Sequence, residues 1–237
     1  MRKGIIMKVS IIVPVFNQWR YTKQMLASLY SNNDMSNVEI IIIDNGSTDE
    51  TNTEVNRMII DGRRIVLLKQ DRNLGVAKAW NIGLRQASGE YIIIMNNDLL
   101  IPKNFIKNYV TCFEKNPDVY AINPIHTDFR VPENFWKKSS EMADQPLNIV
   151  TTWGIAGFCF GIRRTVVEKI GFFDEQFGMM CYEDRDYMRR MKEAGLCSVQ
   201  LTNVWVHHYR NRTLKGIPNR KKIIDENAER FGKKWSV

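Results

Sequence analysis

A short polar turn, Asn96-Asn97-Asp98, directly follows the apolar run Tyr91–Met95. A carboxylate at this position could hold a hard divalent cation such as Mg²⁺ or Mn²⁺, which favours a few protein oxygens together with the phosphate oxygens of a substrate. The cation would neutralise the charge that develops on a leaving diphosphate. The alternative is a plain turn toward the following helix, because Asn and Asp are common turn residues.

A second group of acids, Glu183-Asp184-Arg185-Asp186, opens a stretch with a helical pattern. Acids are favoured in the first turn of a helix by the helix dipole, so capping is one interpretation. The other is general-base catalysis, in which a carboxylate takes the proton from an incoming hydroxyl. At helical spacing Asp184 and Tyr187 share one face while Asp186 points elsewhere, so we do not expect these acids to share one role.

Two histidines, His207-His208, close the last apolar run of the chain, Val199–Val206. Histidine is a common metal ligand. Successive strand residues face opposite sides of a sheet, so only one of the two can enter a site. The alternative is an ordinary structural histidine.

These groups need a scaffold that brings them together. Four short, continuous and β-branched apolar runs begin roughly 25 to 30 residues apart, a spacing that suits βα repeats; they are Val9–Val13, Ile40–Ile43, Ile65–Leu68 and Tyr91–Met95. Continuous apolar runs are typical of strands that are covered on both faces, and hence of a parallel sheet. With helical patterns between them, the runs predict a doubly wound α/β fold that binds its ligands at the carboxyl ends of the strands.

Polar residues follow each of the four runs, at the edge where such a fold binds ligands. The residues that could contact a ligand are Pro14, Phe16 and Asn17 after the first run, Asp44 after the second, Asn73 after the third, and Asn96, Asn97 and Asp98 after the fourth. Asp44 could accept a hydrogen bond from a pyrimidine N3–H, because an ionised carboxylate is a pure acceptor. It could equally form an Asx turn, and Asp49 is interpreted as part of a helix cap.

The second half of the chain has a different pattern. Residues 124–152 contain three prolines and little periodicity, which predicts a long and partly irregular excursion. Helices are expected at about residues 164–170 and 184–194, and the apolar stripe of the last residues predicts a docked helix. We predict one domain over residues 1–237, with a nucleotide-binding half at about 8–123 and an acceptor half at about 124–237 that ends in a basic helix.

Composition and charge narrow the class of protein. The net charge is +8, and residues 207–237 hold nine Lys or Arg against three Asp or Glu. This tail predicts a solvated surface, or contact with a phosphate-rich substrate, an anionic membrane or nucleic acid. No G-x-G-x-x-G follows the first run and no P-loop occurs, which argues against a dinucleotide oxidoreductase. No apolar run approaches the about 20 residues of a membrane span, and no signal peptide is recognised at Met1–Met7.

The segments together resemble the family 2 glycosyltransferases of the GT-A fold, over nearly the whole chain from Val9 to about His208. The similar segments, in family order, are Val9–Asn17, Ile41–Asp49, Arg72–Ala77, Asn96–Asp98, Gly157–Arg164, Gly171–Glu175 and Glu183–Asp186. The resemblance implies an inverting enzyme that moves one sugar from a UDP- or dTDP-sugar to a hydroxyl of a glycan or lipid-linked acceptor. From the dispersed cysteines and the lack of a recognised signal peptide we predict a cytoplasmic protein. Its basic tail is either in peripheral contact with the inner face of the membrane or an ordinary solvated surface.

The resemblance further implies a role for each candidate residue. Asp184 would be the catalytic base, and Asp98 would bind Mn²⁺ or Mg²⁺ together with His208, for which His207 is the alternative. The nucleotide would contact Pro14, Phe16, Asn17, Asp44, Asn73, Asn96, Asn97 and Asp98. The acceptor or the transferred sugar would contact Trp153, Gly157 and Glu183.

Two residues and one absent motif distinguish this chain from the family pattern. Asn96 replaces the first Asp of the family's Asp-x-Asp motif, which leaves Asp98 to hold the metal. The Gln-x-x-Arg-Trp motif of processive members is absent, which predicts transfer of one sugar at a time. Trp80 stands at a position where family members often have a smaller or polar residue.

Two other functions are possible. One is an inactive glycosyltransferase-like binding module, and the other is a nucleic-acid-binding protein, which would show tight, salt-sensitive binding to a duplex.

Overall fold

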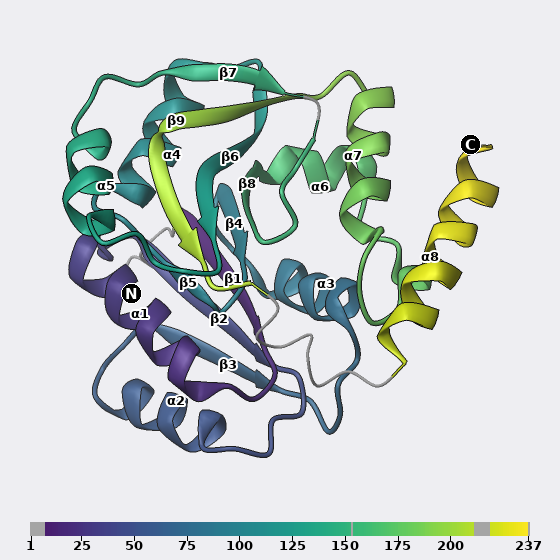
Figure 1. Cartoon of the computed structure of the whole chain (residues 1–237), viewed down its shortest axis with the longest axis horizontal. Helices are drawn as coiled ribbons and strands as arrows, with labels where there is room; N and C mark the ends of the chain where they lie inside the picture. Colours follow the sequence, from purple (N-terminus) through teal and green to yellow (C-terminus); the bar gives the residue numbers. More distant parts are fainter. Residues whose placement is uncertain (1–7, 153, 211–218, 237) are drawn as a thin grey trace, which may run out of the picture.

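A central sheet with helices on both faces organises the chain (Figure 1), for which the computed structural model describes residues 8–152, 154–210 and 219–236. The first four strands are parallel and lie in the order β3-β2-β1-β4. They are β1 (Val9–Val15), β2 (Val38–Asp44), β3 (Ile65–Lys69) and β4 (Tyr91–Met95). The four apolar runs therefore form the strands that their β-branched composition predicts.

Alternate residues of these strands face two separate helix layers. Ile40 and Ile42 belong to the core with α1 (Trp19–Asn32), α2 (Thr51–Ile60) and α4 (Phe105–Lys115). Ile41 and Ile43 belong to the core with α3 (Val76–Gln86). Because both faces of β2 are buried, its sequence is a continuous apolar run rather than an alternating one.

The second half of the chain makes the sheet mixed. Strand β8 (Cys159–Arg163) pairs antiparallel with both β4 and β6 (Val119–Asp128), and β6 pairs parallel with β9 (Cys197–His208). The short strands β5 (Leu99–Leu100) and β7 (Ile149–Thr152) each run antiparallel to β9. The predicted α/β class is confirmed, and the purely parallel arrangement is confined to β1–β4.

The prediction of a partly irregular excursion over residues 124–152 is wrong for most of that segment. Strand β6 continues to Asp128, and α5 (Phe135–Ala143) and β7 follow. Pro124 is accommodated because the β6–β9 register shifts next to it. Pro132 and Pro146 lie outside α5 and so do not interrupt it. The buried side chains of α5, Phe135, Ser139 and Ala143, recur every four residues and form a stripe too narrow to stand out in the sequence.

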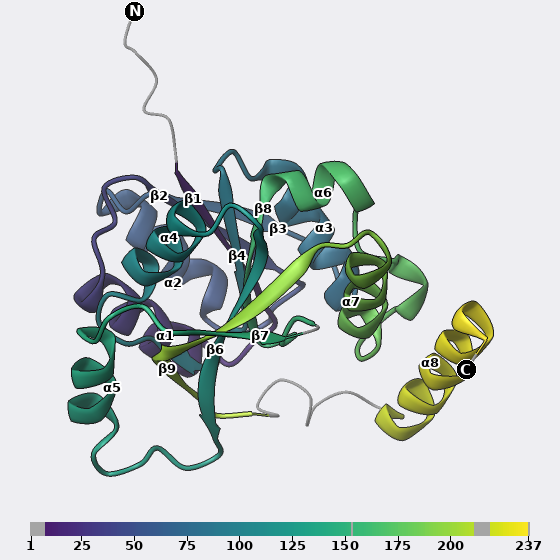
Figure 2. The same ribbon diagram turned by 90° about the horizontal axis from the view of Figure 1, so that it is seen from above.

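The helices expected near the end of the chain are present. They are α6 (Arg164–Ile170), α7 (Glu183–Glu193) and α8 (Arg220–Trp235), and a short 3-10 turn that was not expected, η1 (Glu175–Phe177), lies between α6 and α7. Figures 1 and 2 both show α8 beside α7 at the edge of the molecule, and the Nε1 of Trp235 donates to Asp186 of α7 over 3.0 Å. Within the described ranges, no helix has the length and apolar character that crossing a membrane requires.

Candidate active site

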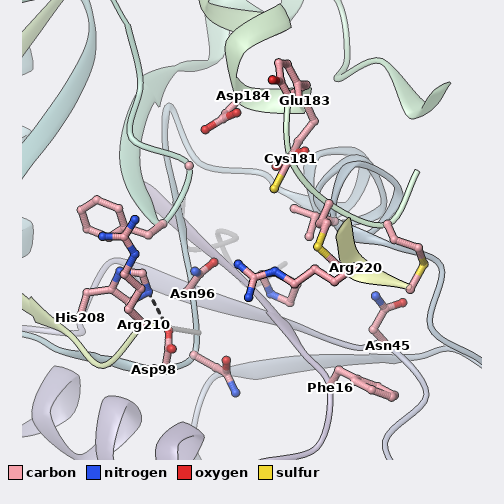
Figure 3. Close-up of a pocket in the computed structure, with 18 of the residues that line it drawn as sticks. Phe16, Asn45, Asn96, Asp98, Cys181, Glu183, Asp184, His208, Arg210 and Arg220 are labelled. Carbon is pink, nitrogen blue, oxygen red and sulfur yellow. Dashed lines mark ion pairs between the residues drawn. The ribbon is translucent and has the colours of Figure 1, made fainter. Parts of the chain in front are cut away.

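A cavity of about 560 Å³ lies at the carboxyl ends of β1 and β4, where they face the start of α7 and the end of β9 (Figure 3). Both halves of the chain contribute to its walls. The predicted site residues that line it are Pro14, Phe16, Asn73, Asn96, Asn97, Asp98, Gly157, Glu183, Asp184 and His208.

One wall of the cavity carries Asp98 and His208 side by side. Strand β5 begins directly after Asp98, and its Leu99 pairs with His208 at the end of β9. The Oδ1 of Asp98 is therefore 3.2 Å from the Nε2 of His208. The neighbouring His207 is buried on the other side of β9, where its Nδ1 lies 3.2 Å from the hydroxyl of Thr127. The pairing of β5 with β9 thus brings His208, and not His207, into the cavity.

Asp128 is a lining residue that the sequence analysis missed. It ends β6 opposite His208 of β9, and its Oδ1 lies 3.5 Å from the Nδ1 of that imidazole. Arg210 pairs with the other carboxylate oxygen of Asp128 over 2.7 Å. The ring of Phe158 stacks on His208 with centroids 4.8 Å apart. The orientation of His208 is therefore defined from two sides. The sequence does not reveal Asp128, because the residues around it show no strand periodicity although β6 extends to this position.

Asp98 and His208 fit a divalent cation that is bound together with a substrate. They direct one carboxylate oxygen and one imidazole nitrogen toward the same space. Among the residues that the structure describes, no group of three or more His, Cys, Asp or Glu side chains could hold a metal ion alone. Mg²⁺ and Mn²⁺ commonly take one or two protein ligands plus substrate phosphates, so this small donor set suits them when a diphosphate is present.

The opposite wall carries Glu183 and Asp184 at the start of α7. The Oδ1 of Asp184 accepts a hydrogen bond of 2.8 Å from the backbone N–H of Arg185. Burial raises the pKa of Asp184 above its usual range. Glu183 is 6% exposed, and burial together with the nearby charge of Asp184 raises its pKa to about 8. Near neutral pH, Glu183 therefore keeps its proton.

Gly157 approaches Asp184 so closely that no side chain fits between them. A Cβ at position 157 would lie 2.7 Å from the Oδ2 of Asp184. The glycine therefore lets the backbone of the glycine-spaced segment reach the carboxylate. Figure 3 shows Asp184 reaching into the cavity toward the side that carries Asp98 and His208.

A loop before α7, residues 177–182, forms a further part of the lining that sequence patterns did not identify. Met179, Met180, Cys181 and Tyr182 of this loop line the cavity. The backbone N–H of Val76 donates to the carbonyl of Met179 over 3.2 Å. A Cβ at position 75 would clash with the carbonyl oxygen of Gly178, so the glycine that precedes α3 is needed for this contact.

Asn45 is another missed lining residue, next to the Asp44 that was predicted to bind the nucleotide. Its Nδ2 donates to the Oδ1 of Asn73 over 2.8 Å, and its Oδ1 accepts from the backbone N–H of Leu74 over 2.9 Å. These bonds join the loops that follow β2 and β3, so that Asn73 and Asn45 face the cavity together.

Asn17 and Asp44 lie outside the lining and hold loops in place. The Oδ1 of Asn17 accepts from the backbone N–H of Thr48 over 2.7 Å. The fully buried carboxylate of Asp44 accepts from the backbone N–H of Ser47 over 2.8 Å and from Asn52 over 3.3 Å. Asp44 thus holds its own loop through the backbone N–H three residues on, and the nucleotide contact predicted for it stays a prediction.

Three more residues that the sequence singled out are accounted for outside the cavity. Trp153 lies outside the described residues. Trp80 is buried in the core against Phe173, with ring centroids 4.8 Å apart. Asp186 is buried and pairs with Arg190 over 3.0 Å, so it has a structural role on α7 that differs from that of Asp184.

Three arginines from separate elements give the cavity a positive rim. Arg185 lies on α7, Arg210 follows β9, and Arg220 begins α8. Figure 3 shows Arg210 beside His208 and Arg220 reaching across the cavity from the other side. Guanidinium groups are favoured partners of phosphate oxygens, so this rim suits a ligand that carries phosphate.

A family model described as glycosyl transferase family 2 matches residues 10–171 of the chain. Glycosyltransferase GlyG of Streptococcus pneumoniae serotype 4 is 31% identical over 121 residues, which cover 51% of this chain and 40% of GlyG. The match thus spans less than half the length of this curated relative.

Two solved structures share the fold. GalNAc-T7, solved with UDP, GalNAc and Mn²⁺, has a TM-score of 0.72 at 15% identity, and the match covers 87% of this chain and 44% of that one. The mannosyltransferase PcManGT from Pyrobaculum calidifontis, solved with GDP-Man and Mn²⁺, has a TM-score of 0.68 at 22% identity, over 85% of this chain and 56% of the other. At these identities the likeness concerns the fold alone, and the predicted GT-A fold is confirmed.

Proposed function

This chain belongs to glycosyl transferase family 2, and from this premise we propose that it is an inverting glycosyltransferase. It moves one sugar from a nucleotide-linked donor, of the UDP or dTDP type, to a hydroxyl of a glycan or lipid-linked acceptor. The observation that carries the proposal is the placement of the Asp184 carboxylate in one cavity with Asp98 and His208. A catalytic base, Asp184, and a pair that binds the diphosphate through a cation, Asp98 and His208, can then act in the same transfer reaction.

The donor nucleotide occupies the strand-end side of the cavity. Pro14, Phe16 and Asn73 line that side together with Asn96 and Asn97. Asn96 contributes an amide, which suits hydrogen bonding to a ribose or a base better than binding of a cation. UDP and GDP-Man in the solved structures with this fold support a nucleotide-linked donor.

The diphosphate lies near Asp98 and His208, with the arginine rim close to it. Asp98 and His208 would hold Mn²⁺ or Mg²⁺, and the cation would supply charge neutralisation for the departing diphosphate. Asp128 keeps the imidazole of His208 oriented through its contact of 3.5 Å with Nδ1. Arg210 and Arg220 add further positive charge on the same cavity.

Asp184 performs the proton transfer. Its carboxylate accepts the proton of the acceptor hydroxyl while the hydroxyl oxygen bonds to the anomeric carbon, on the face opposite the diphosphate. The bond from that carbon to the diphosphate oxygen breaks, the nucleoside diphosphate leaves with the electron pair, and the configuration inverts. The raised pKa of Asp184 makes it a stronger base than an exposed aspartate. The protonated Glu183 beside it can donate a hydrogen bond to the acceptor or the sugar.

The variant Asp184→Asn tests this role, because the amide keeps the size of the side chain but cannot take the proton. A screen of UDP-, dTDP- and GDP-sugars with Mn²⁺ first identifies the donor, and transfer or donor hydrolysis is then measured. We expect at least about a 1000-fold loss of turnover with donor affinity unchanged. The exposed Asp144→Asn is the matched control and should behave like the wild type. Near-normal turnover of Asp184→Asn would refute the base, and turnover absent from the wild type with every donor would favour the binding module.

The exposed lysines of α8 support a peripheral contact with an anionic membrane. Lys221 and Lys222 are exposed near the cavity end of the helix, whereas Lys234 pairs with Asp174 and Asp186, each over 2.7 Å. We expect the chain to sediment with vesicles that contain phosphatidylglycerol, and salt to weaken this binding. The double variant Lys221→Glu and Lys222→Glu should stay in the supernatant. Equal binding to pure phosphatidylcholine vesicles would contradict the electrostatic contact.

A further inference from the structure

One buried side chain of α8, Asn227, holds the loop of residues 177–182 from behind. Asn227 is 1% exposed. Its Nδ2 donates to the carbonyls of Met180 over 2.7 Å and Cys181 over 3.2 Å, and it also contacts the carbonyl of Phe177. A single amide thus satisfies backbone groups along most of the loop.

The loop needs such partners because its backbone is irregular. Gly178, Cys181 and Tyr182 have φ values of +60°, +66° and +75°. The left-handed region is unfavourable for a residue with a Cβ, and buried carbonyls require hydrogen-bond partners. Since Cys181 and Tyr182 directly precede Glu183 and Asp184, their conformation sets where α7 begins and where its first acids point.

The neighbours of Asn227 determine which way its amide faces. The Nη1 of Arg230 donates to the Oδ1 of Asn227 over 3.0 Å and to the carbonyl of Gln176 over 2.8 Å. With the amide oxygen held in this way, the Nδ2 is left for the loop carbonyls. Arg230 therefore fixes the orientation in which Asn227 can hold the loop.

The rest of α8 is attached on both sides of the loop. The Nζ of Lys234 pairs with Asp174 before the loop and with Asp186 after it, each over 2.7 Å. At its other end the helix contributes Arg220 and Ile224 to the cavity lining. Figures 1 and 2 show α8 running alongside α7 in both views. The helix thus connects the cavity rim to the segment that presents the acids.

We propose that Asn227 is a positioning residue for the transfer reaction, which sets the Glu183–Asp184 pair by holding the carbonyls of the 177–182 loop. The inference rests on the proposed role of Asp184 as the base. Helix α8 lies beyond the span that the family model matches. If Asn227 positions the acids of α7, this helix contributes to the transfer reaction.

The variant Asn227→Asp tests the proposal, because a carboxylate of the same size cannot donate to the three carbonyls. Misplacement of a reacting group by about 1 Å can cost on the order of 100-fold in rate, so we expect kcat to fall by about that factor. The affinity for UDP with Mn²⁺ should change less than about threefold, because its proposed contacts lie on the opposite wall. The acid limb of the pH–rate profile should move to lower pH, as Asp184 becomes more hydrated beside Glu183 and Arg185.

The thiol of Cys181 provides a readout that does not depend on activity. It is half-buried in the loop, whereas Cys112 and Cys159 are buried. In a Cys197→Ser background, alkylation of Cys181 by iodoacetamide should be about tenfold faster in Asn227→Asp, because the loop opens more often.

Two further variants make the outcome decisive. Asn116→Asp removes a comparable amide bond to a backbone carbonyl, that of Cys112, at the far end of β6, and should leave kcat and Cys181 alkylation unchanged. Arg230→Met removes the donor to the amide oxygen of Asn227, so it should lower kcat and speed Cys181 alkylation by smaller factors than Asn227→Asp does. This variant replaces Asn227→Asp in the test if the latter does not fold.

The results separate this inference from the proposed function. If Asp184→Asn is inactive while Asn227→Asp keeps its kcat and its Cys181 alkylation rate, the positioning role is wrong and the base assignment stands. Parallel losses of kcat, UDP affinity and thermal stability in Asn227→Asp would leave only a structural role, and would also overturn the proposal. If Asp184→Asn is active, the proposed base fails, and the proposal for Asn227 falls with it.

Discussion

Asp98 and Asp184 face the same cavity but have different neighbours, and this difference assigns them different chemistry. The carboxylate of Asp98 lies 3.2 Å from the imidazole of His208, which suits shared binding of a cation. Asp184 lies beside the protonated Glu183, and burial raises the pKa of both carboxyl groups. A raised pKa favours proton uptake near neutral pH. Two aspartates that look alike in the sequence thus suit metal binding and base catalysis respectively.

Replacing Asp98 tests the proposed cation site. We expect Asp98→Ala to weaken Mn²⁺-dependent UDP binding at least about tenfold, because it removes the carboxylate ligand. Asp128→Asn should weaken it by about tenfold to 100-fold, because His208 loses a partner that orients its ring. Isothermal titration with Mn²⁺ and with EDTA measures both effects, and the exposed Asp118→Ala is the control. Unchanged Mn²⁺-dependent affinity in Asp98→Ala would remove this residue from the site.

At the scale of elements, the loops after β1 and β2 are joined through Asp49. Its Oδ2 accepts from the backbone N–H of Trp19 at the start of α1 over 3.0 Å. Its Oδ1 accepts from the backbone N–H of Thr51 at the start of α2 over 3.1 Å. The capping role predicted for Asp49 is confirmed, and it extends to a second helix that is distant in the sequence. The two helices are thereby held relative to the strand ends that line the cavity.

Removal of this shared cap should cost stability. A helix cap contributes about 0.5–2 kcal/mol, so we expect Asp49→Ala to lower the free energy of unfolding by about 1–2 kcal/mol. This corresponds to a fall in Tm of about 2–4 °C per kcal/mol for a chain of this size. Thermal and urea denaturation measure the effect, and the neighbouring, exposed Glu50→Ala should change the Tm little. Equal stability of the two variants would show that Asp49 does not act as a cap in solution.

The elements also show where sequence patterns work and where they fail. The strands β1–β4 and the helices α6 and α7 follow their predicted spans, because their burial produces continuous or periodic patterns of apolar residues in the sequence. Helix α5 and strand β7 were missed because they are short, and because α5 buries only a narrow stripe against β9. Such elements are stabilised by partners that are distant in the sequence.

At the scale of the whole molecule, one sheet runs through both predicted halves of the chain. Strand β4 of the first half pairs with β8 of the second, and β9 returns to pair with β5. The cavity is therefore built by both halves of the chain. Helix α8 attaches to this unit through Asn227, Lys234 and Trp235.

The buried Glu183 should make the stability of the whole fold depend on pH. Burial raises its pKa from 4.5 to about 8, so the folded chain binds this proton more tightly than the unfolded chain does. The stabilisation is fully present below pH 4.5 and is lost as the pH rises through about 8. Glu183→Gln, which stays neutral, should therefore have a higher Tm than the wild type above pH 8 and a flatter pH dependence.

Thermal denaturation across this pH range measures the difference between the two proteins. The exposed Glu168→Gln is the matched control and should follow the wild type at every pH. If Glu183→Gln and the wild type lose stability in parallel as the pH rises, another group must be responsible. A Tm of Glu183→Gln below that of the wild type at high pH would mean that the carboxylate is stabilised in the fold.

Residue types alone predict the α/β class, the order of the first four strands along the chain and the polar residues at their ends. A strand that is buried on both faces is a short apolar run, and a turn contains Asn, Asp or Gly, so both can be recognised in a short stretch of sequence. The sequence also identifies Asp98 and Asp184 as candidates, because a carboxylate that ends an apolar run or opens a helix is visible without a fold.

How these residues meet depends on the pairing of strands and helices that are distant in the chain. The register of β5 against β9 brings His208 into the cavity and buries His207 behind it. Asp128 and Asn227 act on the site from segments whose sequence carries no motif. Each of these roles depends on pairing between distant parts of the chain, and the residue types at such positions reflect contacts that no local pattern contains.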